Sequence, residues 1–184
     1  KLAEMVDGGL EVHWHLGNHD MWTRGYLADE LGVQVHADPI VVEHEGFRCL
    51  VGHGDGLGPG DRKYKALKRV FRNPAARWAF SRLHPNLAFA VGSRLSRDSR
   101  EAGATSEATY GGPEGEWLYL HCQETLAKEE FDAFIFGHRH LPLDLEVKTA
   151  DGQRTARYLN CGDWLHHRTY VTLDHQGPAL HRWD

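Results

Sequence analysis

Apolar and polar residues alternate along the first fifty residues as they do in short strands. In the segment from Leu10 to Leu16, apolar residues at 12, 14 and 16 are separated by His13 and His15, which predicts a strand with both histidines on its outer face. A helical stretch is expected at 25–32. Three more strand-like runs follow, at 33–40, 41–45 and 47–51, with Gly46 at the last turn.

After residue 60, the spacing of apolar residues changes to that of helices. Tyr64, Leu67 and Val70 recur at a spacing of three, which favours an amphipathic helix. Pro74 can open a second helix, and a third apolar helix is predicted at 87–95. We therefore expect a helical insertion over about 61–101, followed by a loop at 102–115 and a helix at 116–130.

The last third of the chain again has the pattern of strands. A continuous apolar run at 131–136 predicts a buried strand. Further strands are predicted at 143–148, 155–159, 169–173 and 179–183, with Asp151-Gly152 as a hairpin turn. This mixture of strands and helices predicts an α/β fold.

Length and composition describe an ordinary globular chain. The 184 residues, 41% apolar and 26% charged, suit one domain, 1–184. No apolar run approaches the ~18 residues of a membrane span. The three cysteines form no CxxC pair, which favours a reduced, cytoplasmic setting in which each is buried. A net charge of -5 gives no general nucleic-acid footprint.

The beginning of the sequence affects how the rest is interpreted. Residues 1–6 have the pattern of the end of a helix, and there is no initiator methionine. We expect the chain to begin inside a domain and to lack residues that belong to its site.

Three predicted strands end in related polar loops. Their sequences are Gly17-Asn18-His19-Asp20, Gly52-His53-Gly54-Asp55 and Gly137-His138-Arg139-His140. Because ligands of α/β sheets collect at the carboxyl ends of strands, we expect these loops to converge. Imidazole and amide or carboxylate oxygen together suit Mn and related ions. The alternatives are an ordinary turn at 17–20 and coincidental turn histidines in the other loops.

These three loops resemble the last three of five sequence blocks in the calcineurin-like metallophosphoesterases. The first two blocks, D-x-H and G-D-x-x-D, are absent ahead of Gly17. The resemblance implies a two-sheet sandwich flanked by helices, with its N-terminal part missing, and two divalent metal ions, Mn²⁺ first, with Fe or Zn as alternatives. It implies one metal at Asn18, His53 and His138, another at His140, and His19 as the acid.

Positive charge is concentrated in the predicted insertion. Eleven of the 21 basic residues lie between positions 62 and 100, where Asp98 is the only acid. The same segment contains Trp78, Phe80 and Phe89. Such a surface suits an amphiphile with a phosphate-rich head, or a bilayer of anionic lipids. The alternative is a solvated face over a normal helix core.

A narrower resemblance is to the UDP-2,3-diacylglucosamine hydrolases of lipid A synthesis. It rests on the loop at 53–55, the run Asp61-Arg-Lys-Tyr64, the basic insertion and the tail Tyr158-Leu-Asn-Cys-Gly-Asp163-Trp164. It implies cleavage of the substrate's pyrophosphate bond to give lipid X and UMP. Substrate contacts are implied for Asp55, Tyr64, Arg94 and Arg97.

One residue departs from that narrower pattern. The nucleotide-lipid enzymes usually have Arg after Asn in the first loop, where this chain has His19. A general phosphodiesterase or phosphatase therefore stays open, as does a binding module with a degenerate metal site. His166 and His167 are candidates for lining the site, and Asp163 for ordering Trp164 through a turn.

The lead hypothesis also predicts partners and location. It predicts a nucleotide-lipid substrate, a cytoplasmic location with peripheral contact to anionic lipids on the inner face of the membrane, and no nucleic acid. The oligomeric state stays open.

Overall fold

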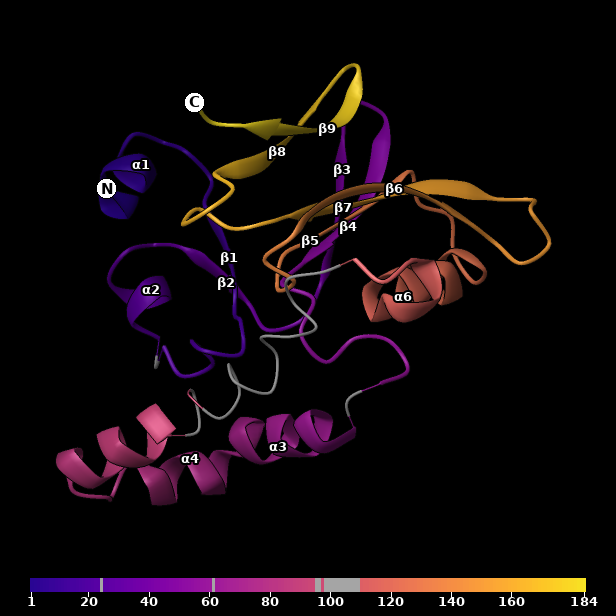
Figure 1. Ribbon diagram of the computed structural model, residues 1–184. Helices are drawn as coiled ribbons and strands as arrows, with labels where there is room; N and C mark the ends of the chain where they lie inside the picture. Colours follow the sequence, from indigo (N-terminus) through magenta and orange to yellow (C-terminus); the bar gives the residue numbers. More distant parts are fainter. Residues whose placement is uncertain (24, 61, 95–96, 98–109) are drawn as a thin grey trace.

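The N-terminal part of the protein forms a small parallel pair of strands, each preceded by a short helix. A computed structural model (Figure 1) describes residues 1–23, 25–60, 62–94, 97 and 110–184. Helix α1 (Leu2–Asp7) precedes β1 (His13–His15), and α2 (Tyr26–Asp29) precedes β2 (Gln34–His36). β1 and β2 pair in parallel, with Trp14 opposite Val35. This pair positions the loop that begins at Gly17.

A five-stranded sheet forms the centre of the protein. Its order is β3 (Ile40–His44), β4 (Phe47–Gly52), β5 (Ala133–Phe136), β7 (Thr155–Cys161) and β6 (Pro142–Lys148). The three inner strands, β4, β5 and β7, run parallel, whereas β3 and β6 are antiparallel edge strands. The loops that follow β4, β5 and β7 therefore begin at the same edge of the sheet, where α/β proteins place ligands.

The two faces of this sheet are covered by different elements. Alternate residues of β5 point to opposite faces: Phe134 and Phe136 pack in the cluster formed with α6 (Trp117–Leu126), and Ala133 and Ile135 pack in the other. The second cluster includes residues of the hairpin of β8 (Thr169–Asp174) and β9 (Gly177–Arg182). Burial of Phe134 and Phe136 contributes about 1.5–3 kcal/mol each, so packing against α6 stabilises the strand that ends at the His138 loop.

The helical insertion lies beyond the sheet edge, at the bottom of Figure 1. It comprises α3 (Arg62–Arg72), α4 (Pro74–Phe80) and a helical run over 85–94. Asn73 caps α4 by accepting hydrogen bonds from two backbone N–H groups, and Pro74 occupies the first turn. The predicted helices are therefore present. A 3-10 turn, η1 (Pro113–Gly115), precedes α6, whereas most of the predicted loop, at 102–109, lies outside the described residues.

Several predictions from the sequence need correction. β1 spans only three residues, and His15 is not turned to solvent: it is half-buried, its ring centroid lies 5.2 Å from that of His36, and burial lowers its pKa. Cys161 is partly exposed, although Cys49 and Cys122 are buried as expected. Within the described ranges the strands form three sheets, because β1–β2 and β8–β9 remain separate pairs.

No helix in the described part of the chain combines the length and the apolar character needed to cross a bilayer.

Candidate active site

The first and second polar loops meet at Gly17. A Cβ atom added to this buried glycine would lie 2.6 Å from Nε2 of His53, closer than nonbonded atoms can approach. The loop is held by Asp20, whose carboxylate accepts hydrogen bonds from Gly17 N at 2.5 Å and from Trp14 Nε1 at 2.8 Å. Asn18, half-buried, is the next residue along the chain. The sequence folds locally so that the loop after β1 contacts the imidazole after β4.

The second and third loops meet through their histidines. The ring centroids of His53 and His138 lie 5.1 Å apart, and Gly137 N donates to the His53 carbonyl at 3.0 Å. His138 has a φ of 68° and His140 a φ of 53°, in the left-handed region that non-glycine residues rarely adopt. Such backbone strain is concentrated at functional sites, and here it accompanies the turn that brings His138 to His53.

Burial is the main reason that the pKa of His138 falls to about 4, and the neighbouring His53 lowers it further. The imidazole is therefore neutral across the physiological range. Neutral imidazole is the form that binds metal ions.

Asp55 connects His53 to the helical insertion. The carboxylate is 4% exposed and accepts hydrogen bonds from His53 Nδ1 at 3.1 Å and from the Tyr64 hydroxyl at 2.5 Å. Lys68 Nζ forms an ion pair with Asp55 Oδ2 at 2.7 Å. Burial by itself raises the pKa of Asp55, but the hydrogen bonds from His53, Lys68 and Tyr64 outweigh it and hold the pKa well below its usual range. Asp55 is thus a buried, ionised group whose partners come from β4's loop and α3.

Trp22 joins the first loop to the insertion. Its indole Nε1 donates to the Phe71 carbonyl at 2.8 Å. Its ring meets Phe71 edge-on at a centroid distance of 5.5 Å and Phe80 at 4.6 Å. A hollow of about 270 Å³ opens beside this junction; its lining is Leu16, Met21, Ala37, Asp55, Lys68, Phe71, Arg72 and Arg77. The hollow has apolar and basic walls next to the polar loops.

A buried ion pair connects the third loop to the start of α6. Arg139, between the two histidines, donates from Nε to Glu116 Oε2 at 2.8 Å, and the Glu116 side chain is only 1% exposed. Asn160 of β7 donates from Nδ2 to the Gly137 carbonyl at 2.5 Å. Glu116 was not identified from the sequence, where its one signal was a charged residue at the start of an amphipathic helix. Asn160 was noticed only as part of the run 158–164, and no role was predicted for it.

The other predicted site residues occupy more open positions. His19 and His140 are exposed at the tips of their loops, and Arg94 and Arg97 are exposed on the insertion. In the described ranges, no hydrogen bond or ion pair joins either arginine to the His53–His138 pair. No group of three or more His, Cys, Asp or Glu side chains in the described residues is arranged to hold a metal ion. Among the predicted ligand residues, the imidazoles that the structure brings together are therefore those of His53 and His138, beside the Asn18 loop.

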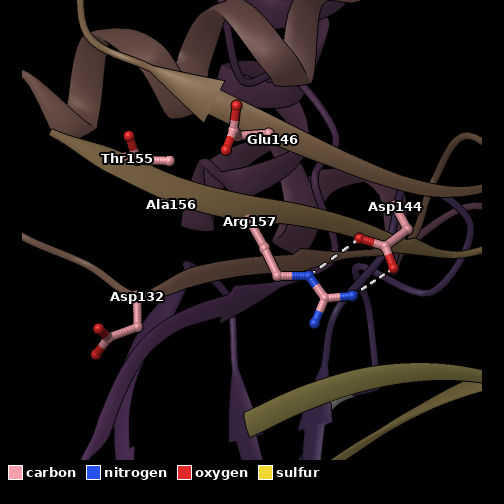
Figure 2. Close-up of a pocket in the computed structure, with 6 residues that line it drawn as sticks. All are labelled: Asp132, Asp144, Glu146, Thr155, Ala156 and Arg157. Atoms are coloured by element: carbon pink, nitrogen blue, oxygen red, sulfur yellow. Dashed lines mark hydrogen bonds and ion pairs between the residues drawn. The ribbon is translucent and has the colours of Figure 1, made fainter. Parts of the chain in front are cut away.

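A larger hollow, of about 410 Å³, lies elsewhere on the sheet. Figure 2 shows Asp144 paired with Arg157 through two contacts, with Nε of Arg157 3.1 Å from Oδ1. Asp132 and Thr155, which also line this hollow, stand at the amino-terminal ends of β5 and β7. The hollow is therefore at the opposite edge of the sheet from the three polar loops. The charge of Arg157 is already balanced by Asp144.

Fold and site together define an α/β protein with histidines gathered at the carboxyl ends of parallel strands. No family model matches the sequence. A UDP-2,3-diacylglucosamine hydrolase of Porphyromonas gingivalis is 35% identical over 95% of this chain and 69% of its own length. Enzymes of the same name from Stutzerimonas stutzeri and Pseudomonas putida are 30% and 26% identical, over 97% of this chain and 68% and 72% of their own lengths. The chain belongs to the UDP-2,3-diacylglucosamine hydrolase family.

Proposed function

We propose that this protein hydrolyses the pyrophosphate bond of UDP-2,3-diacylglucosamine, releasing lipid X and UMP, as a step of lipid A biosynthesis. The relatives are hydrolases named for this substrate. The observation that supports the chemistry most directly is the contact of three loops: Gly17 lies against His53, and His53 lies against His138. These loops follow three different strands, as a site assembled by the fold requires.

Asn18, His53, His138 and His140 would hold divalent metal ions, with Mn²⁺ as the first choice and Fe or Zn as alternatives. Two features of the described residues fit such ligands. His138 is neutral at physiological pH. Nδ1 of His53 donates to the carboxylate of Asp55, which leaves Nε2 as the ring nitrogen for a metal ion. A carboxylate behind a ligating histidine fixes its orientation and makes it more basic. The chemistry that bound divalent ions supply is neutralisation of phosphate charge and activation of water.

Other residues of the chain would donate the proton and bind the head group. His19, exposed at the loop tip, would donate a proton to the leaving phosphate oxygen or stabilise its charge. Tyr64, Arg94 and Arg97 would contact the head group. Asp55 would act on that end of the substrate through Tyr64, because His53, Tyr64 and Lys68 already surround its carboxylate.

The insertion would receive the acyl chains and meet the membrane. It exposes large apolar side chains, among them Trp78 at 62% and Phe89 at 78%. Arg94 and Arg97, also exposed, supply charge that favours anionic lipids by about 1 kcal/mol each. We propose peripheral contact with the inner face of the cytoplasmic membrane. We also propose a fold of the two-sheet metallophosphoesterase type.

A general phosphodiesterase is the second candidate, because His19 stands where the lipid enzymes usually have arginine. Both candidates are tested by assaying the intact protein with Mn²⁺ on UDP-2,3-diacylglucosamine and on a soluble aryl phosphodiester. UMP release from the lipid, abolished by His53→Ala, is the expected result. Turnover of the aryl diester alone would favour the second candidate, and full activity of His53→Ala would contradict the site itself.

A further inference from the structure

The loop after β7, residues 162–168, begins at the same sheet edge as the two histidine loops. β5 and β7 are parallel neighbours with Phe136 opposite Asn160, so His138 and Trp164 follow adjacent strand ends. Neighbouring strands lie about 4.8 Å apart. Along this edge the order is therefore the β4 loop with its insertion, the His138 loop and the Trp164 loop. Trp164 lies on the side of the histidines away from the strand that leads into the insertion.

Hydrogen bonds tie the Trp164 loop to the site. Asn160 donates to the Gly137 carbonyl with its side-chain amide, and its Oδ1 accepts from Gly162 N at 3.2 Å. Gly137 in turn donates to the His53 carbonyl. The Asn160 side chain thus links the turn before His138 to the turn before Trp164. These hydrogen bonds fix the position of one loop relative to the other.

The loop itself is built around a buried carboxylate. Asp163, whose side chain is 8% exposed, accepts hydrogen bonds from His166 N at 2.6 Å and from His167 Nδ1 at 2.9 Å. Burial raises the pKa of Asp163, but these hydrogen bonds hold it below its usual range. Arg168 N closes the loop by donating to the Asp163 carbonyl at 2.8 Å. The loop is therefore ordered without help from a ligand.

This ordered loop presents an aromatic ring to solvent. Trp164 is 60% exposed, although its ring is stacked with Tyr170 at a 13° interplanar angle and lies 6.4 Å from that of Trp183. An exposed indole that neighbouring rings hold in place is the kind of surface on which nucleobases stack. Such stacking does not require hydrogen bonds to the edge of the base. The neighbouring aromatic rings restrict its motion, so little rotamer freedom would be lost on binding.

We propose that Trp164 is the stacking platform for the uracil base of the nucleotide-lipid substrate. This rests on the proposed function and deepens it. The acyl chains would lie towards the insertion, the diphosphate at His53 and His138, and the nucleoside on the β7 side. Cleavage would then leave UMP on the Trp164 side and the lipid on the insertion side.

The test compares two substrates with the intact protein. One is UDP-2,3-diacylglucosamine, and the other is an analogue in which a methyl group replaces uridine on the diphosphate. Trp164→Ala should lower kcat/KM for the uridine substrate about 10-fold, chiefly through KM, and leave the analogue unchanged. Trp164→Phe should restore most of the loss. Leu165→Ala, at a neighbouring residue that is 83% exposed, is the matched control and should change neither substrate.

Product inhibition gives a second measurement. The inhibition constant of UMP should rise about 10-fold in Trp164→Ala, whereas that of inorganic phosphate should not change. Equal losses on both substrates, or no loss on either, would overturn the base platform while leaving the proposed function intact. If the unsubstituted protein cleaves neither substrate, the proposed function is overturned and the platform with it.

Discussion

Asp55 Oδ1 lies 3.1 Å from Nδ1 of His53, and the other oxygen of the same carboxylate receives Tyr64 and Lys68 from α3. One buried side chain therefore orients an imidazole of the site and fixes the first helix of the insertion. We therefore expect a displacement of α3 to change the position of the His53 ring.

Replacing Asp55 by Asn should weaken the site and the fold together. The amide leaves Lys68, whose side chain is 17% exposed, without its counter-charge, at a cost of about 3 kcal/mol in unfolding free energy. Loss of the carboxylate behind His53 should lower Mn²⁺ affinity roughly 10- to 100-fold. Urea denaturation and Mn²⁺ titration measure the two effects. Asp38→Asn, in an exposed pair with Arg72, should change neither, and unaltered Mn²⁺ affinity in Asp55→Asn would contradict its role.

Trp22→Leu tests the junction between the first loop and the insertion. The substitution removes the hydrogen bond to Phe71 and the edge contacts with Phe71 and Phe80, together worth about 2 kcal/mol. Misplacement of the insertion should lower kcat/KM for the lipid substrate roughly 10-fold and affect a soluble diester less. Trp22→Phe, which keeps a ring, should recover part of the loss. Equal losses on both substrates would mean that Trp22 acts only on the loop.

Gly17→Ala tests whether the first loop must lie against His53. The new methyl group would stand 2.6 Å from Nε2 and 2.8 Å from Cδ2 of the imidazole, so the ring must move. Because small displacements of reacting groups are costly, activity should fall roughly 100-fold. Gly115→Ala is the matched control, since its Cβ would meet nothing within 4 Å. Activity of Gly17→Ala near that of the control would show that the contact is dispensable.

The sequence predicted those parts of the fold that depend on local pattern. The hairpin at Gly46, the helix opened by Pro74 and the buried strand that ends at Phe136 all follow from turn chemistry or residue period, and all are present. The length of β1 did not follow, because its three-residue pairing with β2 depends on a partner strand and not on its own alternation.

Contacts between distant residues explain what was missed at the site. The polar loops were visible because their Asn and His residues repeat after similar strands. Glu116 meets Arg139 across 23 positions, and Trp22 meets Phe71 across 49. No spacing rule relates such pairs, so their roles emerge only once the chain is folded. The same holds for His15, whose neighbour His36 comes from a parallel strand.

Glu116→Ala should destabilise the third loop. The substitution removes a carboxylate that is 1% exposed and paired with Arg139, and removing one partner of a buried pair costs about 3–5 kcal/mol. Guanidinium denaturation measures the loss. Glu130→Ala, at a side chain that is 82% exposed and paired with Arg154, should cost less than about 1 kcal/mol. Similar losses in the two variants would argue against a supporting role for Glu116.

The pH dependence of stability should reveal the environment of His138. Its pKa is about 4 in the folded protein, against an ordinary value of 6.5, so the unfolded chain takes up a proton more readily. Protonation of this histidine therefore favours the unfolded chain. The free energy of unfolding is unaffected by it above pH 6.5 and decreases progressively as the pH falls towards 4. Urea denaturation of metal-free protein between pH 7.5 and 4, about the range the two pKa values define, should show this decline. His138→Gln should flatten the decline and His175→Gln, at an exposed position, should not; an unchanged slope in His138→Gln would mean that this imidazole is not the group that titrates.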